Sequence, residues 1–330
     1  MAHLETSYMR IPLKNPILAA SSGLTNSVDK IKELEDNGIG GVVLKSIFEE
    51  QINNEVSSML TQDTQNTDYP EAQDYIKNYL RDNNITRHLK LLEDAKNAVK
   101  IPVIASINCI SGNEWTSFAK DFEQAGADGL ELNIFYVPTR RDENADEIEQ
   151  LYVHVLDQVK KEVKIPVSVK FGLFHSNIIG MADKMKSGGA GGIVMFNRFY
   201  EPDIDLEKME LTSSEVFSSP SDIRHTLRWV GMVSSQVFDL DIAASTGIHD
   251  GKAVVKQLLA GATVAQMCSS LYMNGAQIIP KVLDEIAEFM KKWNFKNIDD
   301  FRGRLSYKNI ADPMMYERSQ FMKYFSDRRS

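Results

Sequence analysis

The stretch NGIGGVVLK, residues 37–45, contains the pattern that decides the fold. Glycine at the end of a helical run adopts the left-handed conformation that terminates the helix. The apolar run that follows is short and β-branched, which is typical of a parallel strand buried on both faces. The same pattern recurs in AGADGLELN (125–133), GGAGGIVMFN (188–197) and AGATVAQMCSS (260–270). The recurrence predicts a repeated helix–strand unit.

Four further apolar runs complete a set of eight predicted strands. The tetrapeptide KIPV opens two of them, KIPVIASIN (100–108) and KIPVSVKF (164–171), while PILAAS (16–21) and LDIAAS (240–245) supply the others. The segments between the runs carry apolar residues at helical spacing, as in residues 144–162. Eight strands that alternate with helices predict an α/β fold, a (β/α)8 TIM barrel.

A doubly wound parallel sheet is the alternative fold. Such a sheet normally has fewer strands and carries a GxGxxG turn after its first strand. Here the first predicted strand is followed by ASSGLTNS, residues 20–27, which lacks that glycine spacing. The sequence therefore favours the barrel.

The spacing between the predicted strands is uneven. Long insertions follow the second strand (46–85) and the sixth strand (198–220), both on the face where the βα loops gather. Long βα loops commonly form lids and substrate walls. We expect residues 1–330 to form a single domain. Its tail, about 292–330, is rich in aromatic residues and methionine and is expected to pack on the barrel or to form a dimer contact.

Composition narrows the class of protein. The 330 residues carry a formal net charge of −9 without a long basic run, which argues against a nucleic-acid-binding surface. No stretch has the length and apolar character of a signal-peptide core or a membrane span. The two cysteines and six histidines show no metal-ligand spacing. We expect a cytoplasmic protein with no membrane or nucleic-acid partner and no protein-bound metal.

Polar residues follow the predicted strands at the end where barrel enzymes carry their active sites. The joints on the opposite face are Gly, Ala and Pro instead. The barrel mouth is therefore the predicted site, and its strand-end residues are Ser21, Lys45, Ser46, Asn108, Asn133, Lys170, Asn197, Ser245–Gly247 and Ser269–Ser270.

Two lysines and two small-residue loops indicate the charge of the ligand. A buried lysine needs an anionic or hydrogen-bonding partner, so Lys45 and Lys170 indicate either structural ion pairs or an electron-rich ligand. The loops after strands 7 and 8 are a common phosphate site in this fold. Here they read STGIHDG (245–251) and CSS (268–270), whose small residues let backbone N–H groups approach a phosphate.

Asn133 and Asn197 add groups that suit a planar ring. Each amide offers a donor and an acceptor to a ring with an amide-like edge. Together with a lysine and a phosphate pocket, they favour flavin mononucleotide (FMN), because the ammonium stabilises negative charge on the reduced flavin. A sugar phosphate fits the same pocket, so an isomerase or aldolase without flavin remains an alternative.

Eight segments resemble the dihydroorotate dehydrogenases, which are FMN-dependent barrel enzymes of pyrimidine biosynthesis. They occur in the same order along nearly the whole chain: NPILAASSG (15–23), VVLKS (42–46), GLELN (129–133), VSVKFG (167–172), MFNRF (195–199), STGI (245–248), GATVAQMCSSLY (261–272) and DFRGRL (300–305). The resemblance is closest to the soluble class 1 enzymes. It implies oxidation of dihydroorotate to orotate, with hydride transfer to flavin N5 and proton abstraction by a base at the barrel mouth.

The resemblance also implies roles for individual residues. Lys45 and Asn133 would contact both flavin and substrate, and Asn197 would bind the substrate. The flavin ring would lie against Ala20, Ser21, Ser46 and Lys170, with Asn108 a further flavin or substrate contact. The phosphate would be held through backbone groups of Thr246, Gly247, Cys268 and Ser269.

Three departures from the family pattern fall in its substrate half. Tyr136 stands where the family usually has a Cys or Ser base. The segment after the second strand, SSMLTQDTQNTDYPEAQDYI (57–76), has no equivalent of the family's Asn-rich substrate loop. Arg198 replaces the Ser that usually follows the asparagine of strand 6, and it favours an acidic substrate. The flavin half of the pattern is kept.

Tyr136 is the candidate base. A tyrosine pKa starts near about 10, so a base role requires that Lys45 or Arg198 lower it. Otherwise Tyr136 acts as an acid in the reductive direction or only walls the pocket. Cys109 and His175, just past the third and fifth strands, are rival proton carriers.

The favoured function is therefore an FMN-dependent dehydrogenase that acts on a CH–CH bond in a small, anionic ring. A flavin enzyme for another dihydropyrimidine or an enoate is the second possibility, and a non-catalytic binding protein is the last. Class 1 relatives suggest a homodimer or association with an electron-transfer subunit. Two cysteines cannot supply an iron–sulfur cluster, so such a centre would belong to another chain.

Overall fold

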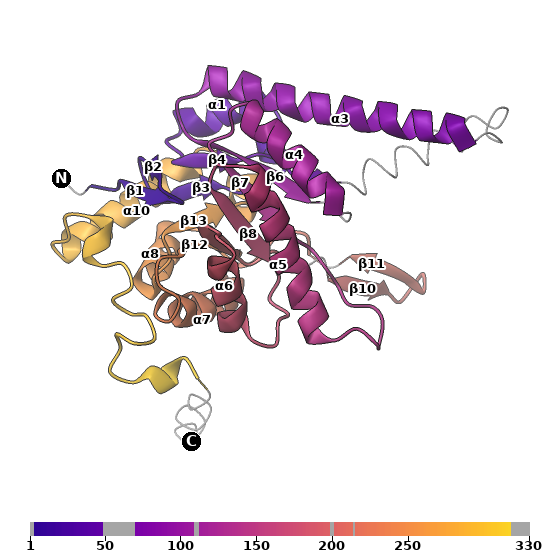
Figure 1. Ribbon diagram of the computed structural model, residues 1–330. Coiled ribbons are helices and arrows are strands. Elements are labelled where there is room, and N and C mark those ends of the chain that lie inside the picture. The colour runs from indigo at the N-terminus through magenta and orange to yellow at the C-terminus, as the bar shows by residue number, and fades with distance from the viewer. Residues whose placement is uncertain (1–2, 49–69, 109–111, 199–200, 214, 318–330) are drawn as a thin grey trace.

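The computed structural model describes residues 3–48, 70–108, 112–198, 201–213 and 215–317. Within these residues the chain forms a ring of parallel strands with helices packed around its outside (Figure 1). Both the short β-branched runs and the amphipathic segments between them adopt the structures that their patterns predict.

Eight parallel strands close into a barrel, as the sequence predicts. They are β3 (Ile17–Ala19), β4 (Gly41–Val43), β6 (Val103–Asn108), β7 (Gly129–Asn133), β8 (Val167–Phe171), β9 (Gly192–Met195), β12 (Asp241–Ser245) and β13 (Val264–Met267). Each strand is hydrogen-bonded to its neighbours in the ring, and pairing of β4 with β6 and of β13 with β3 closes it. The two-residue strand β5 (Ile47–Phe48) adds to the end of β6.

The helices between the strands cover the outer face of the barrel (Figure 1). They are α1 (Val28–Asp36), α3 (Pro70–Ala98), α4 (Gly112–Gln124), α5 (Ala145–Glu162), α6 (Ile178–Ser187), α7 (Ile223–Ser234) and α8 (Gly251–Ala260). After β13 follow the short helix α9 (Ser269–Asn274) and α10 (Ile278–Lys292). Single turns of 3₁₀ helix occupy Gly23–Thr25, Pro220–Asp222, Ile298–Asp300 and Pro313–Met315.

Local sequence signals set the ends of these helices. Asn144 begins α5 with a capping box, in which its side-chain oxygen accepts a hydrogen bond of 2.9 Å from the backbone N–H of Glu147. At the start of α8, the side chain of Asp250 accepts a single capping hydrogen bond of 2.7 Å from the backbone N–H of Ala253. Gly261 ends α8 at a φ of 115°, a conformation that glycine adopts without a steric penalty.

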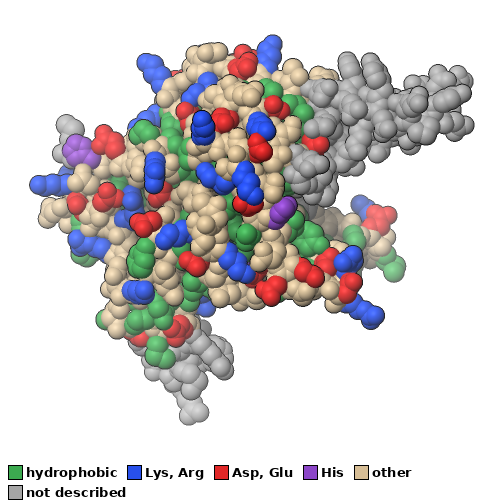
Figure 2. Space-filling view, viewed as in Figure 1, with side chains coloured by type: hydrophobic (Ala, Val, Ile, Leu, Met, Phe, Trp, Pro, Cys, Tyr) green, Lys and Arg blue, Asp and Glu red, His purple; other side chains and the backbone are tan. Residues whose placement is uncertain are grey.

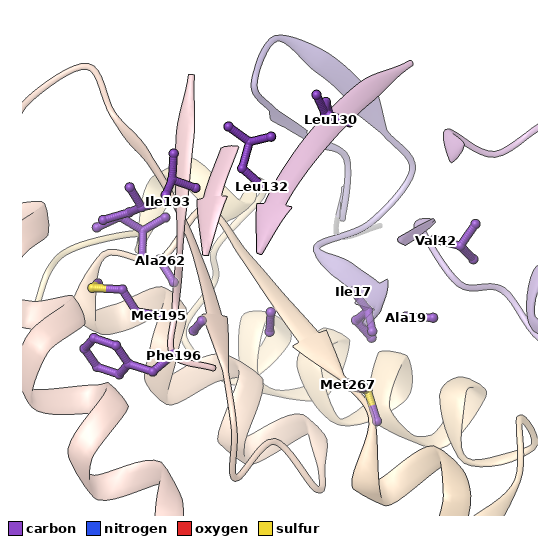
Figure 3. Close-up of a cluster of buried hydrophobic side chains, with 14 of the residues drawn as sticks. Ile17, Ala19, Val42, Leu130, Leu132, Ile193, Met195, Phe196, Ala262 and Met267 are labelled. Atoms are coloured by element: carbon purple, nitrogen blue, oxygen red, sulfur yellow. The ribbon is translucent and has the colours of Figure 1, made fainter. Parts of the chain in front are cut away.

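Two apolar clusters hold the barrel. The larger lies between strands and helices and includes the residues drawn in Figure 3, among them Leu130 and Leu132 of β7. The smaller fills the barrel interior, where a hairpin of β1 (Thr6–Tyr8) and β2 (Ile11–Leu13) contributes Tyr8 and Leu13 to the same cluster as Leu18, Ile104 and Val264.

Strand alternation places polar side chains inside the barrel above the smaller cluster. Because Leu130 and Leu132 pack outward, Glu131 and Asn133 of the same strand point inward. The register agrees, since Lys170 pairs with Val194 and Gln266 with Leu18, both members of the interior cluster. The side chains near the carboxyl ends of the strands therefore converge on one polar layer.

The structure describes the two predicted insertions to different extents. Between β9 and α7 the chain forms an antiparallel hairpin of β10 (Pro202–Asp205) and β11 (Glu210–Ser213), which projects from the barrel (Figure 1). After β5, residues 49–69 lie outside the described residues, and with them most of the segment 57–76. Helix α3 begins at Pro70, so the second half of the predicted insertion 46–85 is helical.

The tail packs on the barrel helices as far as the structure describes it. The backbone N–H groups of Gly303, Leu305 and Tyr307 donate to carbonyl oxygens of Leu258, Leu259 and Gly231. Charges of both signs are interspersed on the face shown in Figure 2. Among the described helices, none is both long and apolar enough to cross a membrane.

Candidate active site

A cavity opens at the carboxyl ends of the barrel strands. It gathers ten of the predicted site residues, which come from strands far apart in the sequence. Its lining is Ala20, Ser21, Lys170, Phe196, Asn197, Arg198, Val216, Ser218, Ser245, Thr246, Gly247, Ile248, Gln266, Cys268 and Ser269. The predicted residues Lys45, Ser46, Asn108, Asn133 and Tyr136 do not line this cavity, although three of them contribute to the polar layer beside it.

Lys170 is one of the two cationic side chains that line the cavity, the other being Arg198. Lys170 lies near the end of β8 and is only 7% exposed. Its Nζ is 3.7 Å from Oε1 of Glu131, which is 1% exposed, and Glu131 Oε2 accepts a hydrogen bond of 2.8 Å from Nε2 of Gln266. Lys170 therefore has a structural ion-pair partner, and because it also lines the cavity, its contact with an electron-rich ligand stays a prediction.

The two predicted asparagines are joined. Nδ2 of Asn197 donates a hydrogen bond of 2.9 Å to Oδ1 of Asn133. Asn133 is buried at the end of β7, directly beside Lys170 in the strand register, while Asn197 is half-buried in the cavity wall. The bond fixes the orientation of both amides, because an amide nitrogen can only donate and an amide oxygen can only accept.

A chain of three serine hydroxyls runs from the cavity into the barrel. Ser21 lines the cavity, and its Oγ lies 3.0 Å from Oγ of Ser46, which in turn lies 2.7 Å from Oγ of Ser106. The backbone N–H of Ser46 also donates to Ser21 Oγ at 2.9 Å. Ser46 therefore positions Ser21 from beneath. Asn108 is buried at the end of β6.

The predicted phosphate turn has an unusual backbone. Thr246 and Gly247 have φ angles of 78° and 77°, so two consecutive residues are in the left-handed region. Thr246 is held there by its hydroxyl, which donates to the carbonyl of Phe196 at 3.2 Å. A Cβ at Gly247 would lie 2.2 Å from the backbone nitrogen of Ile223, at the start of α7. Only glycine therefore fits at position 247, where the turn packs against the start of α7.

Ser218 connects the two predicted phosphate loops through hydrogen bonds, and the sequence analysis did not identify it. It comes from the insertion after β9, and its Oγ lies 3.1 Å from Ser269 Oγ, 3.1 Å from Nε2 of His249 and 3.4 Å from the N–H of Gly247. Its own N–H donates to Ser269 Oγ at 2.9 Å. No motif marks this serine, because only the fold brings residue 218 next to residue 269.

Cys268 is a neutral thiol in this setting. Burial raises the pKa of Cys268, and the nearby Lys170 charge with a hydrogen bond involving Ser22 only partly opposes that effect. The residue therefore suits a backbone contact to a ligand better than a role as a nucleophile.

Lys45 lies near a histidine of α3. It is half-buried after β4, and its charge contributes to a lowered pKa of His88 on α3, for which burial is the larger cause. Lys45 and His88 therefore lie close to each other. Contact of Lys45 with a flavin or a substrate remains a prediction from the resemblance.

Tyr136 does not have the lowered pKa that a base requires. Its hydroxyl donates a hydrogen bond of 2.6 Å to Oε1 of Glu143, and this bond to a carboxylate raises the pKa of Tyr136 above its ordinary value. Arg140 opposes the shift only weakly. The expected partner Arg198 instead donates from Nη1 to the carbonyl of Val216. Neither Lys45 nor Arg198 lowers this pKa, because the side chain is hydrogen-bonded to a carboxylate, so the condition set for a base with a lowered pKa is not met.

Of the two rival proton carriers, Cys109 and His175, the structure describes only His175. Cys109 lies outside the described residues. His175 packs edge-on against the rings of Phe171 and Tyr152, and burial lowers its pKa. Neither of the two cavities at the mouth is lined by His175. Over the described part of the chain, no three His, Cys, Asp or Glu side chains are grouped as metal ligands.

A second cavity adjoins the first and shares Phe196, Asn197, Arg198 and Thr246 with it. It continues toward α7, and its remaining lining is Leu173, Phe174, Glu201, Asp222, His225 and Thr226. Asn197 and Arg198 therefore form the boundary between two compartments of the barrel mouth. This arrangement leaves room for two ligand groups, one on each side.

The closed barrel, with a lysine-lined cavity at the carboxyl ends of its strands, places the chain among the (β/α)8 barrels whose candidate active site lies at the mouth. Residues 3–290 match the family model described as dihydroorotate dehydrogenase. The chain belongs to the dihydroorotate dehydrogenase family, whose members are oxidoreductases.

Individual relatives agree with the family match. The catalytic subunit of dihydroorotate dehydrogenase B (NAD(+)) from Methanocaldococcus jannaschii is 26% identical over 303 residues, which cover 88% of this chain and 94% of that protein. The corresponding subunit from Thermoplasma volcanium is 24% identical, with 92% and 98% covered. Dihydroorotate dehydrogenase A (fumarate) from Limosilactobacillus reuteri is 27% identical, with 88% and 94% covered. The likeness therefore extends over nearly the whole barrel.

Proposed function

We propose that this chain is an FMN-dependent oxidoreductase that oxidises dihydroorotate, or a closely related anionic ring, at a CH–CH bond. One observation carries the proposal. A buried lysine of β8, an asparagine after β9 that is hydrogen-bonded to Asn133 of β7, and the left-handed turn after β12 meet at a single cavity, which Lys170, Asn197, Thr246 and Gly247 line. Membership of the dihydroorotate dehydrogenase family supports the same reaction.

The residues present fit FMN. The left-handed turn at Thr246 and Gly247 packs so closely on the start of α7 that only glycine fits there, and the turn lines the same cavity as Cys268 and Ser269, so small residues let a phosphate approach the backbone N–H groups. At the cavity floor, Lys170 offers an ammonium to the electron-rich edge of the ring. When bound, FMN would accept hydride from the substrate, while the chain orients both partners.

The substrate half of the proposal rests on the boundary between the two cavities. Asn197 and Arg198 face both compartments, so they can contact a ring that lies over the flavin. Among the described residues, Arg198 has no ion pair, which leaves its charge available to a carboxylate. The same observation favours the second candidate, a flavin enzyme for another acidic ring or an enoate, because Arg198 replaces the serine usual in the family.

Partners are proposed on the basis of the relatives. Two of them are named catalytic subunits of an NAD(+)-linked dehydrogenase, and that wording implies at least one further subunit in those proteins. We propose that this chain likewise forms a homodimer or associates with an electron-transfer subunit that passes electrons from FMN to the acceptor.

FMN loading followed by anaerobic reduction tests the proposed function. We expect the purified chain to bind FMN in a 1:1 ratio and to turn yellow. Under anaerobic conditions, dihydroorotate is expected to bleach the flavin at least about tenfold faster than dihydrouracil, because only dihydroorotate carries a carboxylate for Arg198. A chain that takes up no FMN would contradict both flavin candidates. Faster bleaching by dihydrouracil would contradict an anionic substrate.

The raised pKa of Tyr136 gives a pH dependence for proton transfer. We propose that Tyr136 carries the proton, so it must be a tyrosinate to act as the base in substrate oxidation. Because the hydrogen bond to Glu143 holds its pKa above the ordinary value, the oxidation rate should rise about tenfold per pH unit through the neutral and mildly alkaline range. Tyr136→Phe should abolish that rise, as measured by stopped-flow flavin bleaching.

Glu143→Gln is the matched variant for this measurement. It replaces the carboxylate acceptor with a neutral amide, which weakens the hydrogen bond and removes the negative charge that both raise the pKa of Tyr136, so the rise in rate should move to lower pH. If Tyr136→Phe retains the wild-type rate and pH profile, Tyr136 is only a wall of the pocket.

A further inference from the structure

Glu131 is a buried carboxylate that the proposed function does not use. It lies in the middle of β7, points into the barrel and is only 1% exposed. Its strand neighbours in register are Ser106 on β6 and Ser168 on β8, so it sits directly below the layer that carries Lys170 and Asn133. Burying a charge this deeply costs free energy unless the charge is paired and hydrogen-bonded.

The partners of Glu131 are few and are directed toward the cavity. Oε2 accepts one hydrogen bond from Gln266, and Oε1 has no hydrogen-bond partner among the described residues, although Lys170 Nζ lies 3.7 Å away. On the opposite side lies Tyr8, whose pKa is raised by burial first and by the Glu131 charge second. The two side chains that interact with the Glu131 carboxylate by ion pair or hydrogen bond are therefore Lys170 and Gln266, and both of them line the cavity.

Stability alone does not account for this arrangement. A buried ion pair contributes little to stability compared with apolar residues of the same volume, and a separation of 3.7 Å is longer than a charge-assisted hydrogen bond. Glu131 holds Lys170 at the cavity floor and at the same time compensates part of the positive charge of Lys170. The charge that a ligand experiences is then set by the two residues together.

We propose that Glu131 is a positioning residue that sets the charge and the hydrogen-bonding pattern of the cavity floor, and thereby the reduction potential of the bound flavin. The inference rests on the proposed function, since it concerns the FMN site. Lys170 alone would favour the reduced, negatively charged flavin strongly. Glu131 moderates that effect, so the flavin remains able to pass its electrons on.

Gln266 carries the second part of the effect. Only the NH₂ group of an amide can donate to a carboxylate, so Glu131 fixes Gln266 with Nε2 toward itself. Gln266 Oε1 is then left as a buried acceptor without a partner among the described residues, on a side chain that lines the cavity. The floor thus presents a Lys170 donor beside a Gln266 acceptor, which complements a ring edge with a carbonyl next to an N–H.

The test is the reduction potential of FMN in Glu131→Gln. This variant keeps the side-chain volume and removes the negative charge, so Lys170 is no longer compensated. We expect the ratio of reduced to oxidised flavin, measured anaerobically against a reference dye, to rise about tenfold, equivalent to about 30 mV for a two-electron couple. Binding of oxidised FMN, measured by fluorescence quenching, should change less than about threefold.

Glu149→Gln is the matched control. Glu149 pairs with Lys184 at 2.6 Å between α5 and α6, and neither residue lines the cavities at the mouth. The same chemical change there should leave the potential unchanged. Glu131→Asp is a second variant for the event that Glu131→Gln does not fold. Its carboxylate retreats from Lys170 Nζ, so the same shift is expected, at about threefold.

The possible outcomes separate this inference from the proposed function. If the wild-type chain binds no FMN, the proposed function fails and this inference fails with it. If the wild-type chain binds FMN and is reduced by dihydroorotate, but neither Glu131 variant that folds shifts the potential, only the inference is overturned. A shift of equal size in Glu149→Gln would also overturn it.

Discussion

Lys170→Met is expected to lower the free energy of unfolding by about 3 to 5 kcal/mol, as measured by urea denaturation. The substitution removes the only cation paired with Glu131 among the described residues and leaves a carboxylate that is 1% exposed. The same variant should lose most of its FMN binding, because the ring edge loses its ammonium. The double variant Lys170→Met with Glu131→Gln should recover most of the stability but not the FMN binding.

Lys96→Met provides the comparison for stability. Lys96 also pairs with a carboxylate, Asp128 at 2.6 Å, but both side chains are about 30% exposed (31% and 29%). Solvent screens such a pair, so its loss should cost about 1 kcal/mol or less. If the two lysine variants are equally mild, Glu131 is not held as a buried charge. A double variant no more stable than Lys170→Met would point the same way.

Gly247→Ala is expected to disrupt the cofactor site most severely. The new Cβ would lie 2.2 Å from the backbone nitrogen of Ile223, and the φ of 77° adds strain of about 1 to 2 kcal/mol. The turn must therefore move away from α7. Loss of two backbone hydrogen bonds to a phosphate, at about 1.5 kcal/mol each, should weaken FMN binding about 100-fold. Isothermal titration with FMN measures it directly.

Gly126→Ala is the control for this prediction. Gly126 also has a left-handed φ, 89°, but its added Cβ meets no atom within 4 Å. Strain without a clash should cost about 1 kcal/mol of stability and leave FMN binding unchanged. If Gly247→Ala binds FMN as tightly as Gly126→Ala does, the turn at Thr246 and Gly247 does not hold the phosphate.

The eight strands were predictable because the sequence signals for each strand lie within a few residues of it. Glycine after a helix and a β-branched run after the glycine are local signals, and they place strands such as β4 and β7 correctly. The strand ends were equally local, so Lys170, Asn197, Thr246 and Ser269 could be assigned to the mouth before the structure was known. Closure of the ring followed from the number of strands.

The rest of the site depends on contacts that no local pattern contains. Gln266 and Glu131 stand out as polar residues in apolar runs, but their hydrogen bond joins positions 135 residues apart. Ser218 reaches Ser269 from an irregular insertion. The raised pKa of Tyr136 could not be foreseen either, because its cause is a hydrogen bond to Glu143, seven residues later in an irregular loop.

Closure of the barrel also constrains how the chain reaches its final state during synthesis. Strand β3 leaves the ribosome early, and β4 can cover one of its edges soon afterwards, whereas Ile17 on the other edge pairs with Ala265. That edge stays open until β13 has been made. An uncovered strand edge is a template for pairing with other chains. Because β3 and β13 pair only late, the nascent chain can associate with other chains through this strand edge for most of its synthesis. In the finished barrel the edge of β3 is covered by β13.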